Sequence, residues 1–411
     1  MAPPLPTETL KPQNAEEVRE ALAWAVAEGE PIDIAGAGSK DALGRPAAAG
    51  RRLDLSELAD IALYEPDELV MTAGAGAPMG AIEARLEDER QMLAFEPPDF
   101  GLLLGGAVGA ATIGGVLGCN LSGPRRIKAG AARDHFLGVK GVSGRGEAFV
   151  SGGRVVKNVT GYDMCKLLAG SYGTLAAMTE VTIKTVPAPE VSRTVLVLGL
   201  DDAAGVAALG EAARGRFEVS GLAHLPASAT AHSAVAEVAE GPVTALRLEG
   251  PAPSVAARTT ALTAALAGCG PTATLTDQPS RQLWREVRDV AAFAGAHGEA
   301  IVWRLSVTPT AGADVVARIR RSTACEALYD WAGGLVWLRL GRGAPAYAEA
   351  VRAAVAEAGG HALMFRAPAE VRATVAVFEP QPRPLAALSQ RVKDGFDPRG
   401  ILNRGRMVAA P

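Results

Sequence analysis

The first half of the chain alternates between helical and extended patterns of hydrophobic residues. Val18, Leu22 and Val26 recur at helical spacing, and Asn14 before them is a residue type that caps helix starts. Residues 31–35 (PIDIA) form a short apolar run that leads directly into the glycine-rich GAGSK. This order predicts a helix, a strand and a glycine loop.

Similar patterns recur further along the chain. Residues 68–76 (ELVMTAGAG) predict a strand and a turn, and an amphipathic helix is expected over residues 79–90. Residues 137–142 (LGVKGV) and 148–153 (AFVSGG) predict two strands joined by the turn SGRGE.

The composition changes near residues 187–191 (PAPEV), and alanine-rich helices separated by short strands continue to about residue 370. Four expected strands are residues 194–200, 243–250, 300–307 and 334–341. Helix and strand sets of this kind predict an antiparallel sheet covered on one face by helices. After residue 384 the pattern returns to helix and turn.

Composition and charge exclude several classes of protein. With 411 residues, 48% of them hydrophobic, the chain can bury two or more cores. Its 41 basic and 45 acidic residues are well mixed and give a net charge of −4, which argues against a nucleic-acid partner. The four cysteines form no CxxC pair, so no iron–sulfur cluster or disulfide framework is expected. The amino terminus lacks the features of a signal peptide, so we expect a cytoplasmic protein.

Residues 100–123 carry no charge, and by length alone this segment could span a membrane. However, seven of the eighteen residues from 101 to 118 are glycine, which makes a continuous helix costly. We therefore expect no transmembrane segment. Glycine at this density is more typical of backbone that approaches another group closely.

Three glycine-bearing segments are candidates for ligand binding. Residues 36–40 (GAGSK) follow a strand and could cradle a phosphate, but they match neither the P-loop nor GxGxxG, so a turn without ligand stays open for this loop alone. Residues 111–120 (ATIGGVLGCN) combine close glycines with hydroxyl and amide groups. Residues 155–164 and 168–175 add more glycines, hydroxyls and aromatic rings. Separated loops of this kind suit one extended dinucleotide.

Together these segments resemble the FAD-binding domains of the vanillyl-alcohol-oxidase (PCMH) superfamily. The resemblance rests on the strand and glycine loop, the AT-IGG segment, RDHFLG at 133–138, GYD at 161–163 and the GS-x-GTL segment. It covers roughly residues 10–186, and residues 396–407 resemble the superfamily's closing motif. Within the superfamily the chain is most similar to the FAD-binding subunits of glycolate oxidase.

The resemblance implies an α+β protein with a PCMH-type FAD-binding domain and an α+β cap domain. It implies the FAD-binding domain over residues 1–186, the cap over 187–370 and a segment that returns to the FAD domain over 371–411. Residue by residue, it implies three sets of FAD contacts: the diphosphate loop, the ribityl and phosphate segment, and a segment along the dinucleotide. These are Gly36, Ala37, Gly38, Ser39 and Lys40; Thr112, Ile113, Gly114, Gly115, Gly118, Cys119 and Asn120; and Tyr172, Gly173, Thr174, Ala177 and Met178.

The chain departs from the superfamily at Tyr172, where relatives usually have Glu, and at Ala176, where they usually have Gly. Covalent flavin in this superfamily usually needs His or Cys beside a glycine loop. The first loop has Ser39 and Lys40 instead, and Cys119 is expected in a segment that starts a helix where relatives bind FAD without a covalent bond. The resemblance therefore implies non-covalent FAD, and we interpret His135 as a packed strand residue.

Oxidation of a 2-hydroxy acid needs a hydride acceptor, a base and a cation for the carboxylate. FAD supplies only the first. Catalytic relatives carry a metal cluster written H-x-G-D-x-N-x-H, which this chain lacks; residues 297–299 (HGE) are a fragment. We therefore assign no catalytic residue and no metal. The candidate cations, for which we favour a solvated edge or a phosphate contact, are Arg125, Arg126, Lys128, Arg304, Arg339 and Arg366.

The resemblance implies a subunit that takes part in oxidising glycolate, a small 2-hydroxy acid, to glyoxylate. A second flavin subunit and an iron–sulfur subunit would be its partners and could bring it to the inner face of the membrane. Two alternatives remain open: a flavin-carrying scaffold or electron-transfer subunit without catalysis, and a stand-alone FAD-dependent dehydrogenase.

Overall fold

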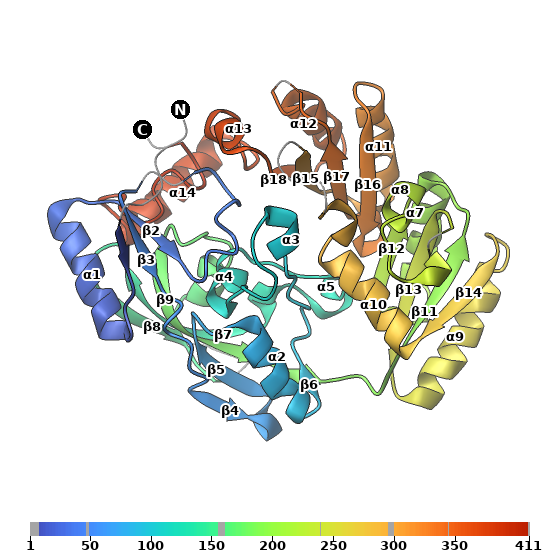
Figure 1. Cartoon of the computed structure of the whole chain (residues 1–411), viewed down its shortest axis with the longest axis horizontal. Helices are drawn as coiled ribbons and strands as arrows, with labels where there is room; N and C mark the ends of the chain where they lie inside the picture. The colour runs from blue at the N-terminus through green and yellow to red at the C-terminus, as the bar shows by residue number, and fades with distance from the viewer. Residues whose placement is uncertain are drawn as a thin grey trace. The chain divides into compact units, whose positions relative to one another are not determined.

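In the computed structural model the chain divides into two compact units (Figure 1). The structure describes residues 8–46, 49–154, 161–238, 240–294, 300–343 and 345–409. Unit 1 comprises Met1–Ser122, Gly130–Ala188 and Arg372–Pro411. Unit 2 comprises Gly123–Ala129 and Pro189–Val371.

Unit 1 begins with a small parallel sheet of order β1-β3-β2 and a helix that packs on it. The Asn14 side chain accepts a hydrogen bond from the Glu17 N–H at the start of this helix, as the sequence predicts, and Gly29 ends it at φ 71°. The helix buries Val18 and Leu22 against the sheet. These elements are β1 (Glu8–Leu10), α1 (Ala15–Glu28), β2 (Ile32–Ala35) and β3 (Arg51–Asp54).

The second sheet of unit 1 has five antiparallel strands in the order β4-β5-β9-β7-β8. The expected pair of strands around SGRGE is confirmed as β7 and β8. The sheet consists of β4 (Leu63–Glu65), β5 (Val70–Gly74), β7 (Phe136–Ser143), β8 (Ala148–Gly152) and β9 (Ala176–Lys184). Its neighbours include α2 (Met79–Asp88) and the short pair β6 (Gln91–Met92) and β10 (Val186–Pro187).

The glycine-rich segment 100–123 folds into very short helices. None of the helices that the structure describes is long and apolar enough to cross a membrane. At Gly114 an added Cβ would lie 2.6 Å from the backbone oxygen of Ala75, so the glycine permits a close backbone approach. The short helices of unit 1 are α3 (Gly101–Leu104), α4 (Ile113–Gly118) and α6 (Met164–Leu168), whereas α5 (Arg126–Ala129) belongs to unit 2.

The end of the chain packs back on the first sheet of unit 1. The Ile32 N–H donates to the carbonyl of Ile401 at 2.8 Å, and the Asn403 N–H donates to the carbonyl of Ile32 at 2.9 Å. Asp397 is buried and accepts hydrogen bonds from the backbone N–H groups of Ile401 and Leu402. The helices before this tail are α13 (Ala369–Thr374) and α14 (Arg383–Phe396).

Unit 2 is built on one antiparallel sheet of eight strands in the order β14-β11-β13-β12-β16-β17-β15-β18. The four strands expected from the sequence are β11 (Val191–Leu198), β13 (Val243–Gly250), β15 (Ile301–Ser306) and β17 (Leu335–Leu340). The others are β12 (Gly221–Leu225), β14 (Thr272–Thr276), β16 (Cys325–Asp330) and β18 (His361–Arg366). Its helices are α7 (Asp202–Arg214), α8 (Ala227–Thr230), α9 (Ala252–Leu266), α10 (Asp277–Arg288), α11 (Gly312–Arg320) and α12 (Ala348–Ala356).

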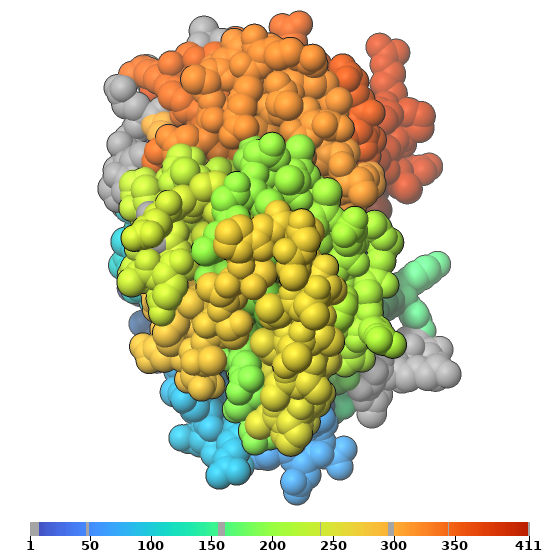
Figure 2. Space-filling model, turned by 90° about the vertical axis from the view of Figure 1, so that its right-hand side faces the viewer, coloured from blue at the N-terminus to red at the C-terminus, as the bar shows by residue number. Residues whose placement is uncertain are grey.

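Helices lie on both faces of this sheet, so the expectation of a single covered face is wrong. Val195 and Val197 point to the core under α7 and α9, and Figure 2 shows the yellow α9 across that face. Thr194, which precedes Val195 on the strand, points the other way and accepts a hydrogen bond from the Trp284 Nε1–H of α10 at 2.8 Å. The buried hydroxyl groups of Ser192 and Thr194 on this face of β11 therefore find their hydrogen-bonding partners on α10.

Candidate functional site

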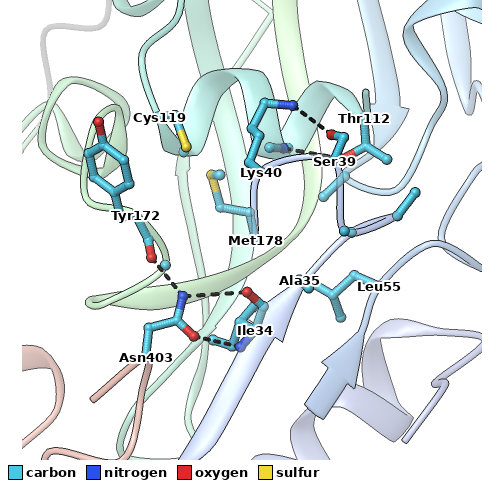
Figure 3. A pocket seen from close by; sticks show the side chains of 18 of the residues that line it. Ile34, Ala35, Ser39, Lys40, Leu55, Thr112, Cys119, Tyr172, Met178 and Asn403 are labelled. Carbon is cyan, nitrogen blue, oxygen red and sulfur yellow. Dashed lines mark hydrogen bonds between the residues drawn. The ribbon is translucent and has the colours of Figure 1, made fainter. Parts of the chain in front are cut away.

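Unit 1 contains a cleft that holds about 710 Å³ of empty space. Three glycine-bearing segments bound it: the loop after β2, helix α4 with its flanking residues, and the turn before β9 (Figure 3).

The loop after β2 lies directly against the start of α4. A Cβ added to Gly36 would lie 2.5 Å from the Thr112 hydroxyl oxygen, so no larger residue fits there without movement. Gly38 has φ +74°, a conformation that L side chains rarely adopt. Both glycines line the cleft, so the backbone at these positions carries no side chain of its own.

Thr112 fixes the start of α4 because its hydroxyl oxygen accepts a hydrogen bond from the Gly115 N–H at 3.3 Å. Gly114, Gly115 and Gly118 line the cleft along this helix. Cys119 lies at the carboxyl end of α4. The expectation that Cys119 belongs to a helix start is therefore wrong, because the Thr112 cap begins the helix seven residues earlier.

The turn before β9 contributes Tyr172 and Gly173, both with positive φ, at 55° and 70°. The Tyr172 N–H donates to the carbonyl of Gly118 at 2.8 Å, which joins this turn to α4. The Tyr172 ring meets Phe378 edge to face, with 4.8 Å between ring centroids. The turn before β9 is thus fixed by α4 through the Tyr172 backbone and by Phe378 through the Tyr172 ring.

Asn403 connects two of these segments at the floor of the cleft (Figure 3). Its side-chain oxygen accepts from the Ile34 N–H at 2.5 Å, and its Nδ2 donates to the carbonyl of Tyr172 at 2.6 Å. The same residue has φ +42°. One amide side chain from the chain's end therefore links β2 to the turn before β9.

Charged groups around the cleft form one compact set. Asp33 is buried and pairs with Arg52 at 2.8 Å, and Arg52 also pairs with Asp41 at 2.7 Å. Arg406 lies 3.6 Å from Asp33 and donates to the backbone carbonyl of Lys40. The Lys40 Nζ is 3.1 Å from the hydroxyl oxygen of Ser39.

Burial lowers the pKa of Lys40, although Cys119 and Asp99 act in the opposite direction. Burial also raises the pKa of Cys119, with Lys40 and Arg406 opposing that shift. Cys119 is therefore a protonated thiol at neutral pH, and burial disfavours the charged forms of both Lys40 and Cys119.

Most of the residues expected at the FAD site meet at this cleft. The lining includes Gly36, Ala37, Gly38, Ser39, Lys40, Thr112, Gly114, Gly115, Gly118, Cys119, Tyr172, Gly173 and Met178. Four expected residues do not line it: Ile113 and Ala177 are buried in the core, Asn120 accepts a hydrogen bond from the Arg133 N–H, and Thr174 donates to the carbonyl of Ser171.

Sequence reasoning did not assign several lining residues. These are Ile34, Ala35, Asp41, Leu55, Ala75, Ala176, Asn403 and Arg406. Asn403 and Arg406 lie in the closing motif that carries part of the resemblance, so that motif was the available signal. The first part of the expected third segment, residues 155–160, lies outside the described residues, and Tyr162 after it is 90% exposed.

The candidate cations of unit 2 are engaged within that unit. Arg125 forms a two-point ion pair with Glu249, Arg339 pairs with Glu326, and Lys128 lies 4.0 Å from Glu218. Arg126 and Arg304 stack on Trp331 at 4.6 and 5.2 Å from its ring centre. Arg366 donates to the carbonyl of Phe293, and burial lowers its pKa.

The histidines do not gather at the cleft. His135 is buried beside Phe95, His224 lies 2.9 Å from the hydroxyl of Thr244, and His232 and His361 are exposed; His297 lies outside the described residues. Among the described residues, no group of three or more His, Cys, Asp and Glu side chains could hold a metal ion.

The cleft fits an extended dinucleotide. Glycines line it where an added Cβ would collide, exposed backbone faces it at Gly38, and Lys40 offers a positive charge for an anion. Ile34, Leu55 and Met178 supply apolar surface to the same wall. A phosphate-bearing cofactor with a flat ring system would meet suitable groups throughout.

Comparison with known proteins agrees with this fit. Residues 6–152 match the FAD binding domain family. The chain is 32% identical over 392 residues to glycolate oxidase subunit GlcE of Escherichia coli (strain K12), covering 95% of this chain and 96% of that one. It is 30% identical over 195 residues to glycolate oxidase subunit GlcD of Bacillus subtilis (strain 168), covering 47% of this chain and 40% of that one. The fold is similar to that of p-cresol methylhydroxylase, with a TM-score of 0.68, 15% identity and coverage of 98% and 88%.

The fold and the cleft define the class: this chain is an FAD-binding oxidoreductase with the PCMH-type architecture. The similarity to the Escherichia coli protein spans nearly the whole of both chains. The chain belongs to the glycolate oxidase subunit GlcE family.

Proposed function

We propose that the chain holds FAD without a covalent bond in the cleft of unit 1 and works as the FAD-binding subunit of a multi-subunit glycolate oxidase. The complex would oxidise glycolate to glyoxylate and pass the electrons to a partner. The observation that carries this proposal is that three separate glycine-bearing segments line one cleft, in a chain related along its whole length to a glycolate oxidase subunit. Bound FAD would supply the two-electron acceptor.

Within the cleft, the loop Gly36–Lys40 would hold the FAD diphosphate through its uncovered backbone and the Lys40 charge. The α4 segment from Thr112 to Asn120 would lie along the ribityl and phosphate region, and the turn from Tyr172 to Met178 would follow the dinucleotide. Glycines and capping hydroxyls suit these roles because they bring donors close to phosphate oxygens without a side chain between them.

A dissociable FAD is supported by the chemistry of the cleft wall. Among the described lining residues there is no histidine, and Cys119 is the lining thiol. Burial raises the pKa of Cys119, which disfavours the thiolate that a bond to the flavin ring would need.

The partners are proposed from the relatives. Two relatives of this chain are named as subunits of glycolate oxidase, one similar over its full length and one over less than half of it. The four cysteines of this chain have no iron–sulfur spacing. We propose that a second flavin subunit and an iron–sulfur subunit carry electrons onward, and that any contact with the inner face of the membrane is made through them.

Two measurements on purified protein test the proposal. Acid precipitation of the isolated chain should release one FAD into the supernatant, whereas flavin that stays with the pellet would show a covalent bond. Co-expression with a second flavoprotein and an iron–sulfur protein of the glycolate oxidase type should give a complex that reduces an artificial acceptor with glycolate.

The isolated chain should be nearly inactive in the same assay. Among the described residues at the cleft, the carboxylates and the arginines pair with one another, and Lys40 is the charged group outside these pairs. A base and a separate cation for the substrate are therefore not both available. Glycolate oxidation by the single chain at the rate of the complex would favour the stand-alone dehydrogenase. A chain that takes up no FAD on titration would overturn the proposal.

A further inference from the structure

Lys40 differs from the other cations of the cleft in its partners. Arg406 and Arg52 both lie within ion-pairing distance of Asp33, and Arg52 also pairs with Asp41. For the Lys40 Nζ, the described residues offer the hydroxyl of Ser39 at 3.1 Å and no carboxylate oxygen within 4.0 Å. Within the described part of unit 1, this ammonium group therefore lines the cleft without an acidic partner.

The surroundings of Lys40 are glycine-rich and poor in charge. The side chain reaches from its loop toward α4, and a Cβ added to Gly115 would lie 3.4 Å from Nζ (Figure 3). A charged group kept from water costs free energy unless a counter-charge or hydrogen bonds replace the lost solvent. Lys40 is partly buried, and the one neutral hydroxyl of Ser39 replaces little of the solvent that its amine loses.

The titratable and charged groups that face Lys40 come from four segments. They are Asp41 of its own loop, Asp99 before α3, Cys119 at the end of α4, and Arg406 of the carboxyl-terminal tail. Asp41 is engaged by Arg52, and Cys119 is a protonated thiol. Asp99 accepts hydrogen bonds from the Gly101 and Gly109 N–H groups and acts on Lys40 only from beyond 4.0 Å.

We propose that Lys40 is a proton-linked counter-charge for the diphosphate of FAD, so that cofactor loading takes up a proton and depends on pH. This rests on the proposed FAD-binding function of the cleft. The diphosphate is the anionic part of FAD, and the loop that carries Lys40 lines the cleft at Gly38, where no side chain stands between the backbone and a phosphate. The Lys40 ammonium and the backbone at Gly38 would then both bind the FAD diphosphate.

The sign of the pH dependence follows from the two environments of the amine. In the protein without FAD, burial lowers the pKa of Lys40 and shifts the amine toward its neutral form. A bound diphosphate favours the ammonium and raises that pKa again. Between the two values, each FAD that binds takes up a proton, and the dissociation constant rises about tenfold per pH unit. Below both values the affinity is highest and constant.

The test compares FAD binding by the full chain and by the variants Lys40→Met and Lys40→Arg, followed by quenching of flavin fluorescence from about pH 6 to about pH 10. We expect Lys40→Met to bind FAD roughly 10–100-fold more weakly and without the pH dependence, since it loses a charge-assisted hydrogen bond. Lys40→Arg keeps a permanent charge and should bind without the pH dependence. Lys140→Met, which removes an exposed lysine paired with Glu180 on the sheet, should match the wild type.

Two further readouts separate this role from a general loss of structure. Calorimetric titration in two buffers of different ionisation enthalpy should show proton uptake with wild type and none with Lys40→Arg. The flavin midpoint potential should be the same in wild type and in FAD-saturated Lys40→Met, because a group at the diphosphate binds oxidised and reduced flavin equally.

Wild-type affinity and pH profile in Lys40→Met would overturn the proposal while leaving the FAD site in place. A large shift of the midpoint potential in that variant would also overturn it, because Lys40 would then act on the flavin ring. A wild-type chain that binds no FAD would instead refute the proposed function of the cleft, and this inference with it.

Discussion

Two partly or largely buried charged groups, one in each unit, have opposite surroundings. Glu249 of unit 2 has a side chain that is 9% exposed and accepts two hydrogen bonds from Arg125, at 2.9 and 2.6 Å. Arg247 lies 3.4 Å away and Ser220 donates its hydroxyl at 2.5 Å. Lys40 of unit 1 has one hydroxyl contact at 3.1 Å.

The pKa values move accordingly. Burial alone would raise the pKa of Glu249, but Arg247 and Arg125 hold it at about 2, which means that the folded unit favours the charged form. For Lys40 burial dominates and lowers the pKa, so the folded unit disfavours the charge. A buried charge whose partners all belong to the chain is part of the structure, whereas one without them is a candidate ligand contact.

The largest expected effect comes from removing the paired charge. Glu249→Ala leaves Arg125 and Arg247 without their common partner and should lower the free energy of unfolding by about 3–5 kcal/mol. Lys40→Met should not destabilise the FAD-free protein, because it removes a charge that burial disfavours. Urea unfolding followed by circular dichroism measures both, and Glu16→Ala, in an exposed pair on α1, is the control that should stay unchanged.

Equal losses of stability in Glu249→Ala and Lys40→Met would mean that both groups stabilise the fold, contrary to the difference in their surroundings. No loss in Glu249→Ala would mean that the ion pairs around it contribute nothing to unit 2.

Acid should remove the same stabilisation more gradually. Because the pKa of Glu249 is lowered on folding from 4.5 to about 2, its contribution is present above the unfolded value and is lost as the pH falls from about 4.5 toward 2. The loss amounts to about 3 kcal/mol at most. Glu249→Gln cannot titrate, so its stability should fall less over this interval, which acid unfolding at several urea concentrations would show. Parallel curves for the two proteins would contradict the lowered pKa.

A smaller effect is expected at Asn403, which links β2 to the turn before β9. Asn403→Ala removes the hydrogen bonds with Ile34 and Tyr172 and should cost about 1–3 kcal/mol. FAD affinity should fall as well, since two lining segments lose their connection. Gln390→Ala on the exposed face of α14 is the matched amide control and should leave FAD affinity unchanged. Undiminished affinity in Asn403→Ala would show that the cleft does not depend on this link.

Local patterns predicted much of the fold because they depend on neighbouring residues. The Asn14 cap, the β7 and β8 pair and four strands of unit 2 all follow from spacing and turn residues, and the structure confirms them. The glycine loops pointed to the cleft for the same reason: their conformations and close approaches are local requirements of the backbone.

Features that depend on distant pairing were missed. Asn403 reaches the cleft only because the chain's end hydrogen-bonds to Ile32 beside β2, across a large sequence separation. Helix α10 lies over the polar face of β11, where Ser280 and Trp284 form hydrogen bonds with the buried hydroxyl of Thr194. The largely apolar composition of the strand gave no sign that this face needs hydrogen-bonding partners. The sequence could not show that Lys40 lacks an acidic partner. Asp41 is its neighbour in the sequence, but in the structure the Asp41 carboxylate pairs with Arg52.

The most direct test of the central claim, that the glycine-walled cleft of unit 1 is the FAD site, compares two substitutions with the same backbone strain. Gly38 and Gly29 have φ of +74° and +71°, so Asp at either position should cost about 1–2 kcal/mol. Gly38→Asp also places a carboxylate beside Asp41 in the cleft, whereas Gly29 lies at the end of α1 with open space around it. We predict that purified Gly38→Asp is folded but colourless while Gly29→Asp retains one FAD per chain; full FAD content in folded Gly38→Asp would show that FAD binds elsewhere.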